Sequence, residues 1–274
     1  MFYNTMKTSL LFLSLLAVPC VITSCKDDAE NQAATQTAAE KVFMIYEKTM
    51  PDGSEKGAFY AGYRGDTNYL ERISGQSLEP YGLGAALAGR TELVLRCIAL
   101  DEGALNDALM GAAAGGHKDL VQILLDKGVK PKTGLIGAAM GGHLDLVQLM
   151  LDKGANPKMG LMGAAMGGHL NIVKLMFEYG ANEKDEALEV ASGLGHCDIV
   201  QFLLQRGADP NGGLKSAAEM GQAAVLKLLL AHPNIRVNEK DSKGKTPLDY
   251  ATEKGHIECV NLLRAAGGKR GSKF

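Results

Sequence analysis

The chain has 274 residues and a formal net charge of −2, with 46% hydrophobic and 22% charged residues. This composition excludes a disordered or fibrous protein, and the mildly acidic charge excludes the basic footprint of nucleic-acid binders, so we expect no nucleic-acid partner. The 34 glycines and the absence of tryptophan indicate turns at regular places, which favours an internal repeat.

Residues 1–24 have the pattern of a secretory signal peptide. Lys7 precedes an apolar run from Leu10 to Ile22, and small residues follow the run. The run is shorter than the about 20 residues that a membrane-spanning helix needs. The segment that begins at Met6 has the same pattern by itself, so either Met1 or Met6 can be the true start.

The signal peptide ends in Ile22-Thr23-Ser24-Cys25, which resembles the lipobox of bacterial lipoproteins. In that family the lipid is attached to the cysteine thiol, and cleavage makes the cysteine the new N-terminus. Cys20 fits the pattern less well, because Pro19 would precede the cleaved bond. Cys25 is therefore the predicted lipidation site, and several acyl chains would anchor the protein stably. The alternative is an ordinary secretory signal followed by an incidental cysteine.

Residues 25–40 form a predicted polar tether with few apolar side chains to bury. Its acidic start, Asp27-Asp28, resembles the surface-export signals of some bacterial lipoproteins, but any polar tether would look similar. The resemblance implies a lipoprotein of the cell envelope that touches the membrane through its lipid alone. Periplasmic and surface-exposed locations both stay open.

A pattern of small residues that ends in Gly-Gly-His recurs along the chain. Gly111–His117, Gly137–His143 and Gly163–His169 are nearly identical, and their histidines are 26 residues apart. His196, Gln222 and His256 continue the series at intervals of 27, 26 and 34 residues. An amphipathic segment with a terminal glycine follows each of them, as in Leu144–Gly154. One such helix pair cannot bury its own apolar face, so the pairs must stack.

The last unit, with Thr246-Pro247-Leu248-Asp249 and Gly255-His256, resembles the ankyrin repeat, in which a histidine stands in the place of Asp249. The inner units keep the second half of that pattern, but they are shorter than the family period of about 33 residues. The resemblance implies an all-α solenoid of stacked helix-turn-helix units, mostly short repeats of 26–27 residues that lack the β-hairpin finger. A complete finger is expected only around Val237–Thr246.

The resemblance also sets the expected domain organisation. An N-terminal helix and a degenerate capping repeat are expected at 41–79, the ankyrin repeats at 80–267 and a solvated basic tail at 268–274.

In the family, the position three residues before the Gly-His histidine leans outward from the first helix of each unit. Along the stack we find there Leu87, Ala114, Met140, Met166, Gly193, Glu219 and Glu253. The candidate partner-binding residues are Leu87, Met140, Met166, Glu219 and Glu253, because methionines suit adaptable binding surfaces and exposed apolar patches mark interaction sites. The alternative is that Met140 and Met166 pack against the next unit.

The recurring histidines do not predict a metal site. Stacked helices lie about 8–10 Å apart, which is too far for neighbouring histidines to share a zinc ion. The family resemblance instead implies that each histidine starts the second helix and bonds to nearby backbone. We expect no catalytic residue, no metal and no cofactor.

The sequence therefore predicts a monomeric, non-catalytic protein–protein interaction module at the bacterial cell envelope, with an unidentified protein partner. One alternative is an immunity or inhibitor protein that blocks a toxin or an enzyme. Another is a small-molecule-binding or enzymatic role in the concave groove. The lack of a convergent set of polar residues speaks against that last alternative.

Overall fold

The computed structural model describes residues 40, 43–44, 54–72 and 77–271. The predicted signal peptide, Cys25 and nearly all of the predicted tether lie outside these residues. Within them the regular structure is entirely helical, and no helix is long and apolar enough to cross a membrane. The chain divides into two compact units, one ending at Ala181 and one starting at Asn182, and each is described by itself.

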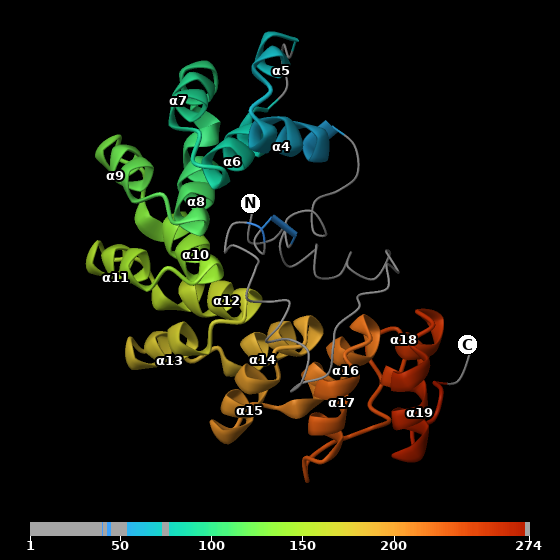
Figure 1. The fold of residues 1–274 in the computed structure, drawn as a ribbon. Coiled ribbons are helices and arrows are strands. Elements are labelled where there is room, and N and C mark those ends of the chain that lie inside the picture. Colours follow the sequence, from blue (N-terminus) through green and yellow to red (C-terminus); the bar gives the residue numbers. More distant parts are fainter. Residues whose placement is uncertain (1–39, 41–42, 45–53, 73–76, 272–274) are drawn as a thin grey trace. The chain divides into compact units, whose positions relative to one another are not determined.

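The unit that ends at Ala181 is a row of helix pairs (Figure 1). We call the first helix of a pair inner and the second outer. The inner helices are α4 (Ser54–Arg64), α6 (Glu79–Leu87), α8 (Leu105–Gly115), α10 (Pro131–Gly141) and α12 (Pro157–Gly167). The outer helices are α5 (Thr67–Arg72), α7 (Thr91–Leu100), α9 (Lys118–Asp126), α11 (Leu144–Asp152) and α13 (Leu170–Glu178), and a 3-10 turn, η2 (Glu102–Ala104), precedes α8. Each inner helix packs against the inner helix of the next pair, which confirms the predicted stack.

Proline and glycine set the bounds of the inner helices. Pro131 opens α10, where its missing N–H costs no hydrogen bond, and Gly142 ends the helix with a φ of 80°. Only glycine adopts that left-handed conformation without strain. Pro157 and Gly168 bound α12 in the same way, so the short repeat carries its own start and stop signals.

Neighbouring inner helices touch backbone to backbone. A Cβ atom on Gly141 of α10 would lie 2.2 Å from the carbonyl oxygen of Ala114, and one on Gly137 would lie 2.1 Å from that of Met110. No side chain fits in either place. The small residues of the repeat are therefore needed for this close approach, and the leucines and valines of the outer helices supply the buried bulk.

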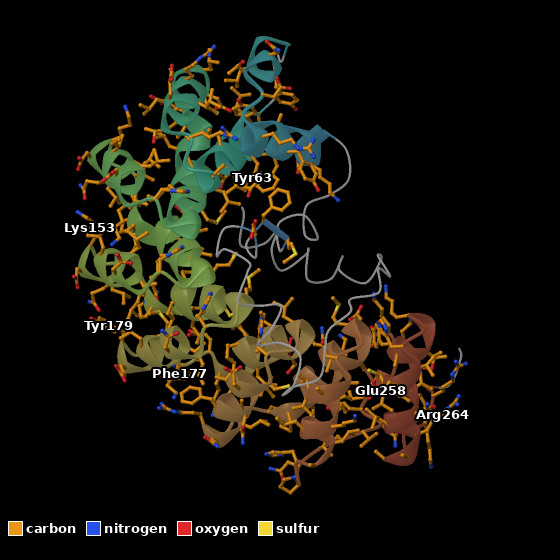
Figure 2. The ribbon with its side chains drawn as sticks, viewed as in Figure 1. Tyr63, Lys153, Phe177, Tyr179, Glu258 and Arg264 are labelled. Atoms are coloured by element: carbon orange, nitrogen blue, oxygen red, sulfur yellow. The ribbon has the colours of Figure 1, made fainter. Side chains whose placement is uncertain are left out.

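Aromatic rings cover the N-terminal side of this unit. The Phe43 ring lies 5.5 Å from that of Phe59 and 4.5 Å from that of Tyr63, measured between ring centres. Figure 2 labels Tyr63 on α4. The Phe59 side chain on α4 is fully buried. A terminal unit has no further neighbour to cover its apolar face, and these rings supply that cover.

The unit that starts at Asn182 repeats the same arrangement. Its inner helices are α14 (Lys184–Leu194), α16 (Pro210–Met220) and α18 (Pro247–Glu253), and its outer helices are α15 (Cys197–Gln205), α17 (Ala223–Leu230) and α19 (Ile257–Ala265). Helices α14, α16 and α18 pack in sequence, as do α15, α17 and α19. One leucine from each helix is buried in its core: Leu188, Leu203, Leu214, Leu229, Leu248 and Leu263.

The connections between pairs differ in length, as the short period predicts. Residues 127–130 alone link α9 to α10, and 206–209 alone link α15 to α16, whereas 231–246 link α17 to α18. The long connection contains a tight turn, in which Asp241 N–H donates to the Lys245 carbonyl at 3.0 Å and Gly244 N–H donates to the Asp241 carbonyl at 2.9 Å. This connection is the predicted complete finger.

The backbone of the C-terminal tail is held by the last repeat. Gly271 N–H donates to the Asp249 carboxylate at 2.8 Å, and the Thr246 hydroxyl donates to the Lys269 carbonyl at 2.8 Å. The Lys269 and Arg270 side chains are exposed, as a solvated basic tail requires, but the chain that carries them is fixed as far as residue 271. This contact gives Asp249 a role in the position where the ankyrin pattern has histidine.

Candidate interaction surfaces

The recurring histidines join successive helix pairs. Nε2 of His143 lies 3.1 Å from the Ala114 carbonyl oxygen, and Nε2 of His117 lies 3.0 Å from that of Leu87. His169 and His256 make the same contact, and the Gln222 side chain replaces it by donating to the Gly193 carbonyl at 3.1 Å. These side chains are structural. Among the described residues, no group of three histidines, cysteines or acids is placed to hold a metal ion.

Three of the five candidate binding residues lie in the core. The exposed fraction is 0% for Leu87, 1% for Met140 and 7% for Met166. In this conformation they offer a partner no surface, and the close approach of the inner helices explains why. For the two methionines, this placement corresponds to the alternative in which they pack inside the stack.

The other two candidates, Glu219 and Glu253, reach the surface. Glu219 on α16 is half-buried and Glu253 on α18 is exposed. Burial raises the pKa of the Glu219 carboxyl, while lysines, chiefly Lys215, act in the opposite direction. Glu253 forms an ion pair with Lys245 at 2.6 Å. The apolar and acidic ends of the predicted stripe therefore differ in exposure as well as in chemistry.

Tyr250 lies between the two lysines at this end of the stack. The Lys215 and Lys245 Nζ atoms lie 5.3 Å and 5.4 Å from the centre of its ring, within the range of cation–π attraction. Its hydroxyl donates a hydrogen bond to the Asp241 carboxylate, and burial together with this bond raises the pKa of Tyr250. We define the charged end as Lys215, Glu219, Lys245, Tyr250 and Glu253.

The sequence reasoning missed three members of the charged end, although a signal was present. The position that holds histidine in the ankyrin pattern carries Met110, Ile136 and Met162 in the repeats that end at Ala181. In the repeats that start at Asn182 it carries Glu189, Lys215 and Asp249. This change from apolar to charged residues marks where the inner helices become polar. It does not show that Lys245 comes back from the finger to the same ring.

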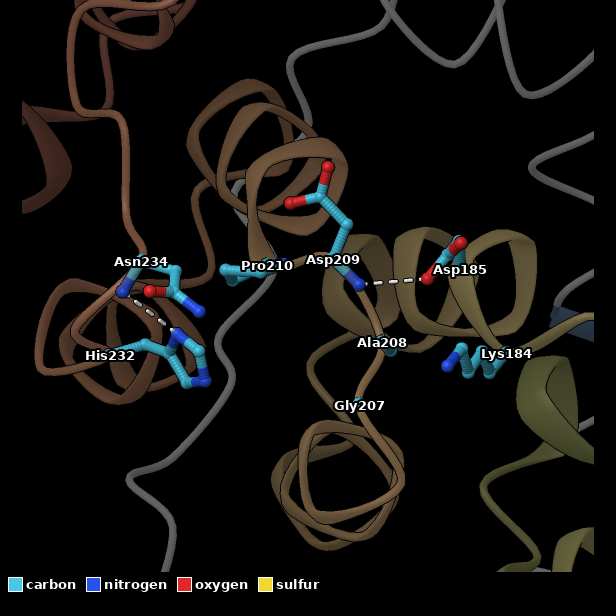
Figure 3. Close-up of a pocket in the computed structure, with 8 residues that line it drawn as sticks. All are labelled: Lys184, Asp185, Gly207, Ala208, Asp209, Pro210, His232 and Asn234. Atoms are coloured by element: carbon cyan, nitrogen blue, oxygen red, sulfur yellow. Dashed lines mark hydrogen bonds between the residues drawn. The ribbon is translucent and has the colours of Figure 1, made fainter.

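A cavity of about 440 Å³ lies beside the connections of the second unit (Figure 3). Its lining residues are Lys184, Asp185, Gly207, Ala208, Asp209, Pro210, His232 and Asn234. The short connection 206–209 adjoins the long connection 231–246 here, so the cavity follows from their difference in length. Asp209 N–H donates to Asp185 at 2.8 Å, and Lys184 Nζ donates to the Arg206 carbonyl at 3.2 Å.

Neither of the free cysteines of the described residues belongs to the charged end or to the pocket lining. Cys97 and Cys259 are buried, and burial raises the pKa of the Cys97 thiol to about 12 and that of Cys259 to about 11. A thiol with such a pKa carries almost no thiolate at neutral pH. Neither cysteine has the character of a nucleophile.

Comparison with known proteins identifies the repeat. A model of three consecutive ankyrin repeats matches residues 83–160, 135–212 and 213–271. Similar curated proteins include the E3 ubiquitin-protein ligase Ufd4 of Drosophila melanogaster, 40% identical over 91 residues, which are 29% of this chain and 3% of the ligase. Ankyrin repeat domain-containing protein 63 of Mus musculus is 33% identical over 93 residues, which are 30% of this chain and 24% of that protein.

A human relative is matched over most of its own length. Cyclin-dependent kinase 4 inhibitor B of Homo sapiens is 30% identical over 123 residues, which are 31% of this chain and 89% of the inhibitor. By contrast, the chain spans 3% of the fly ligase and about a quarter of the mouse protein. The similarity to those two proteins therefore concerns only a part of each. Since the repeat model covers more than half of the chain and the described helices stack in pairs within each of the two units, this protein belongs to the ankyrin-repeat family.

Proposed function

We propose that this chain is a non-catalytic module that binds a protein partner at the bacterial cell envelope, where a lipid on Cys25 holds it. The charged end carries the proposal for binding. It combines two lysines and two glutamates from two neighbouring inner helices and the finger, and the two lysines flank the ring of Tyr250, which is itself buried.

Glu219 is the member of the charged end that has the most to gain from a partner. Within the described part of the chain its carboxylate has no hydrogen bond and no ion pair, although the residue is half-buried. Burying a carboxylate further is favourable only if a donor or cation satisfies it. A partner that supplies such a group to Glu219, and acids to the lysines, would complete the charges of this surface.

A crosslinking pull-down from membranes tests the proposal, with Glu219→Lys as the variant. We expect the wild-type chain to recover a specific protein, and Glu219→Lys to lose most of it, because a charge reversal at an interface costs several kcal/mol. Arg264→Glu is the matched control, since Arg264 is an exposed side chain of α19 outside the charged end (Figure 2). Recovery of a metabolite without any protein partner would defeat the proposal and favour the groove-binding alternative.

The lipid tether rests on Ile22-Thr23-Ser24-Cys25 and the apolar run before it. Labelling with radioactive palmitate should mark the wild-type chain and leave Cys25→Ala unmarked. A Cys20→Ala variant is the control, and it should label like the wild type. Equal labelling of the wild type and Cys25→Ala would overturn the tether and leave the binding proposal in place.

An inhibitor or immunity role is the second candidate. The similarity to a protein that is named an inhibitor of a kinase favours it, because the match covers 89% of that inhibitor. The two candidates differ in what happens to the partner. If the recovered partner is an enzyme or toxin, its activity should fall when the chain is added in equal amount, whereas simple binding or scaffolding would leave that activity intact.

A further inference from the structure

Four acidic residues gather where the second described pair meets the third. Glu79 lies in the first turn of α6, Asp101 and Glu102 lie at η2, and Asp107 lies in the first turn of α8. We call this group the acidic notch. It belongs to the unit that ends at Ala181, whereas the residues of the charged end are all in the other unit.

Asp107 is the unusual member of the notch. Its exposed fraction is 6%, and within the described part of the chain its side-chain carboxyl makes no hydrogen bond or ion pair. Asp101, in contrast, is satisfied by the N–H groups of Leu78 and Gly103, both at 2.9 Å. A buried carboxyl without a partner is costly, so it either keeps its proton or receives a cation.

Two carboxylates of the notch come close together at Gly103. A Cβ atom on it would lie 2.9 Å from an Asp101 carboxylate oxygen and 3.2 Å from Oε1 of Glu79. Its φ is not positive, so the backbone does not require glycine there. The two carboxylates thus converge over a bare Cα atom, and any larger residue would displace them.

The charge around Asp107 is of one sign. Burial and then the Glu79 carboxylate raise the pKa of Asp107 to about 7, and Glu79 is the charged group that acts on it within the described residues. These acids are not placed to hold a metal ion. An ammonium or guanidinium group can reach them with charge-assisted hydrogen bonds of about 2.7–2.9 Å. Such a group also arrives on a long flexible stem, which lets it approach a carboxyl that is mostly buried.

We propose that the acidic notch receives an arginine or lysine side chain of the protein partner, with Asp107 as its buried counter-charge. The proposal rests on the proposed function in one respect, namely that the chain binds a protein. On binding, Asp107 gives its proton to solvent, and the incoming cation takes the place of that proton beside the carboxylate.

Titration calorimetry of the full chain with blocked hexa-arginine tests this. At pH 7, in two buffers that differ in ionisation enthalpy, we expect the wild-type chain to release about half a proton on binding, because about half of the Asp107 carboxyls are protonated there. Asp107→Asn should bind about ten- to a hundredfold more weakly and release no proton, since a hydrogen bond to a charged group is lost.

Asp119→Asn is the matched control, because Asp119 is an exposed acid of α9 outside the notch. It should bind and release protons as the wild type does. Asp107→Asn should remain folded, because the change removes an unpaired buried acid. Glu79→Gln, at a half-buried position of the notch, is a second variant that should also weaken binding.

Two outcomes would overturn the proposal: wild type and Asp107→Asn releasing the same number of protons, or hexa-arginine binding equally to both. These outcomes are separable from a failure of the proposed function. If the pull-down recovers a partner while hexa-arginine ignores Asp107, the notch proposal alone fails. If hexa-arginine displaces the Asp107 proton while no protein is recovered, the proposed function alone fails.

Discussion

Nε2 of His143, the residue before α11, lies 3.1 Å from the carbonyl oxygen of Ala114, near the end of α8. Because a carbonyl oxygen can only accept, Nε2 carries the hydrogen. The ring also covers the preceding unit, since a Cβ on Gly116 would lie 2.5 Å from its Cε1 atom. One side chain thus satisfies a carbonyl at a helix end and sets the spacing of two successive helix pairs.

We predict that His143→Ala lowers the free energy of unfolding by about 1–3 kcal/mol, because the Ala114 carbonyl loses a partner and a cavity opens over Gly116. His143→Gln should cost less, since Gln222 makes the equivalent bond to Gly193. Urea unfolding of both variants measures this. Equal losses for the two would show that the hydrogen bond contributes little.

Gly141→Ala should destabilise the protein by more than about 1 kcal/mol, although alanine is ordinarily the better helix former. The added Cβ would meet the Ala114 carbonyl oxygen at 2.2 Å and force α8 and α10 apart. Gly57→Ala is the matched control, because Gly57 is helical and has nothing within 4 Å of its Cβ position. That variant should gain about 0.5–1 kcal/mol. A stabilised Gly141→Ala would contradict the backbone contact.

The stability that Asp107 contributes should depend on pH. Its pKa is raised from 3.8 to about 7 in the folded chain, so the folded state holds the proton more tightly than the unfolded state. The resulting stability is fully present below pH 3.8 and is lost as the pH rises through 7, with a span on the order of 4 kcal/mol. The free energy of unfolding of Asp107→Asn minus that of the wild type should therefore be larger at pH 8 than at pH 5. Urea unfolding at both pH values measures this, and an equal difference at the two would contradict the buried acid.

Asp249→Ala should release the C-terminal tail. The Asp249 carboxylate accepts from Thr246 N–H at 2.9 Å and from Gly271 N–H at 2.8 Å, and it completes the capping box of α18. Loss of the cap and the tail contact should cost about 1–2 kcal/mol. Hydrogen exchange should show Gly271 N–H losing its protection while the core of α16 keeps its own. Unchanged protection at Gly271 would show that the tail is held by other contacts.

The features of the fold that the sequence predicts are those set by residues that recur in each repeat and act on their own helix. Pro131 and Gly142 announce the bounds of α10 wherever the chain lies, because they act on their own backbone. The 26-residue spacing of His117, His143 and His169 leaves no room for a finger, and the structure has none there. The candidate site was less predictable. Met140 and Glu219 hold the same position in their units, yet one is buried and the other is half-exposed.

The sequence alone determined that this chain is a stack of short ankyrin-type helix pairs, because proline, glycine and histidine recur at spacings that act within one unit or between adjacent ones. Only the tertiary structure decided which side chains remain for a partner. Exposure depends on how closely the neighbouring helices approach, and that distance is set by glycines such as Gly141, which meets the backbone of the preceding inner helix. The pairing of Lys215 and Lys245 about Tyr250, and the burial of Asp107 beside Glu79, follow from the same long-range packing.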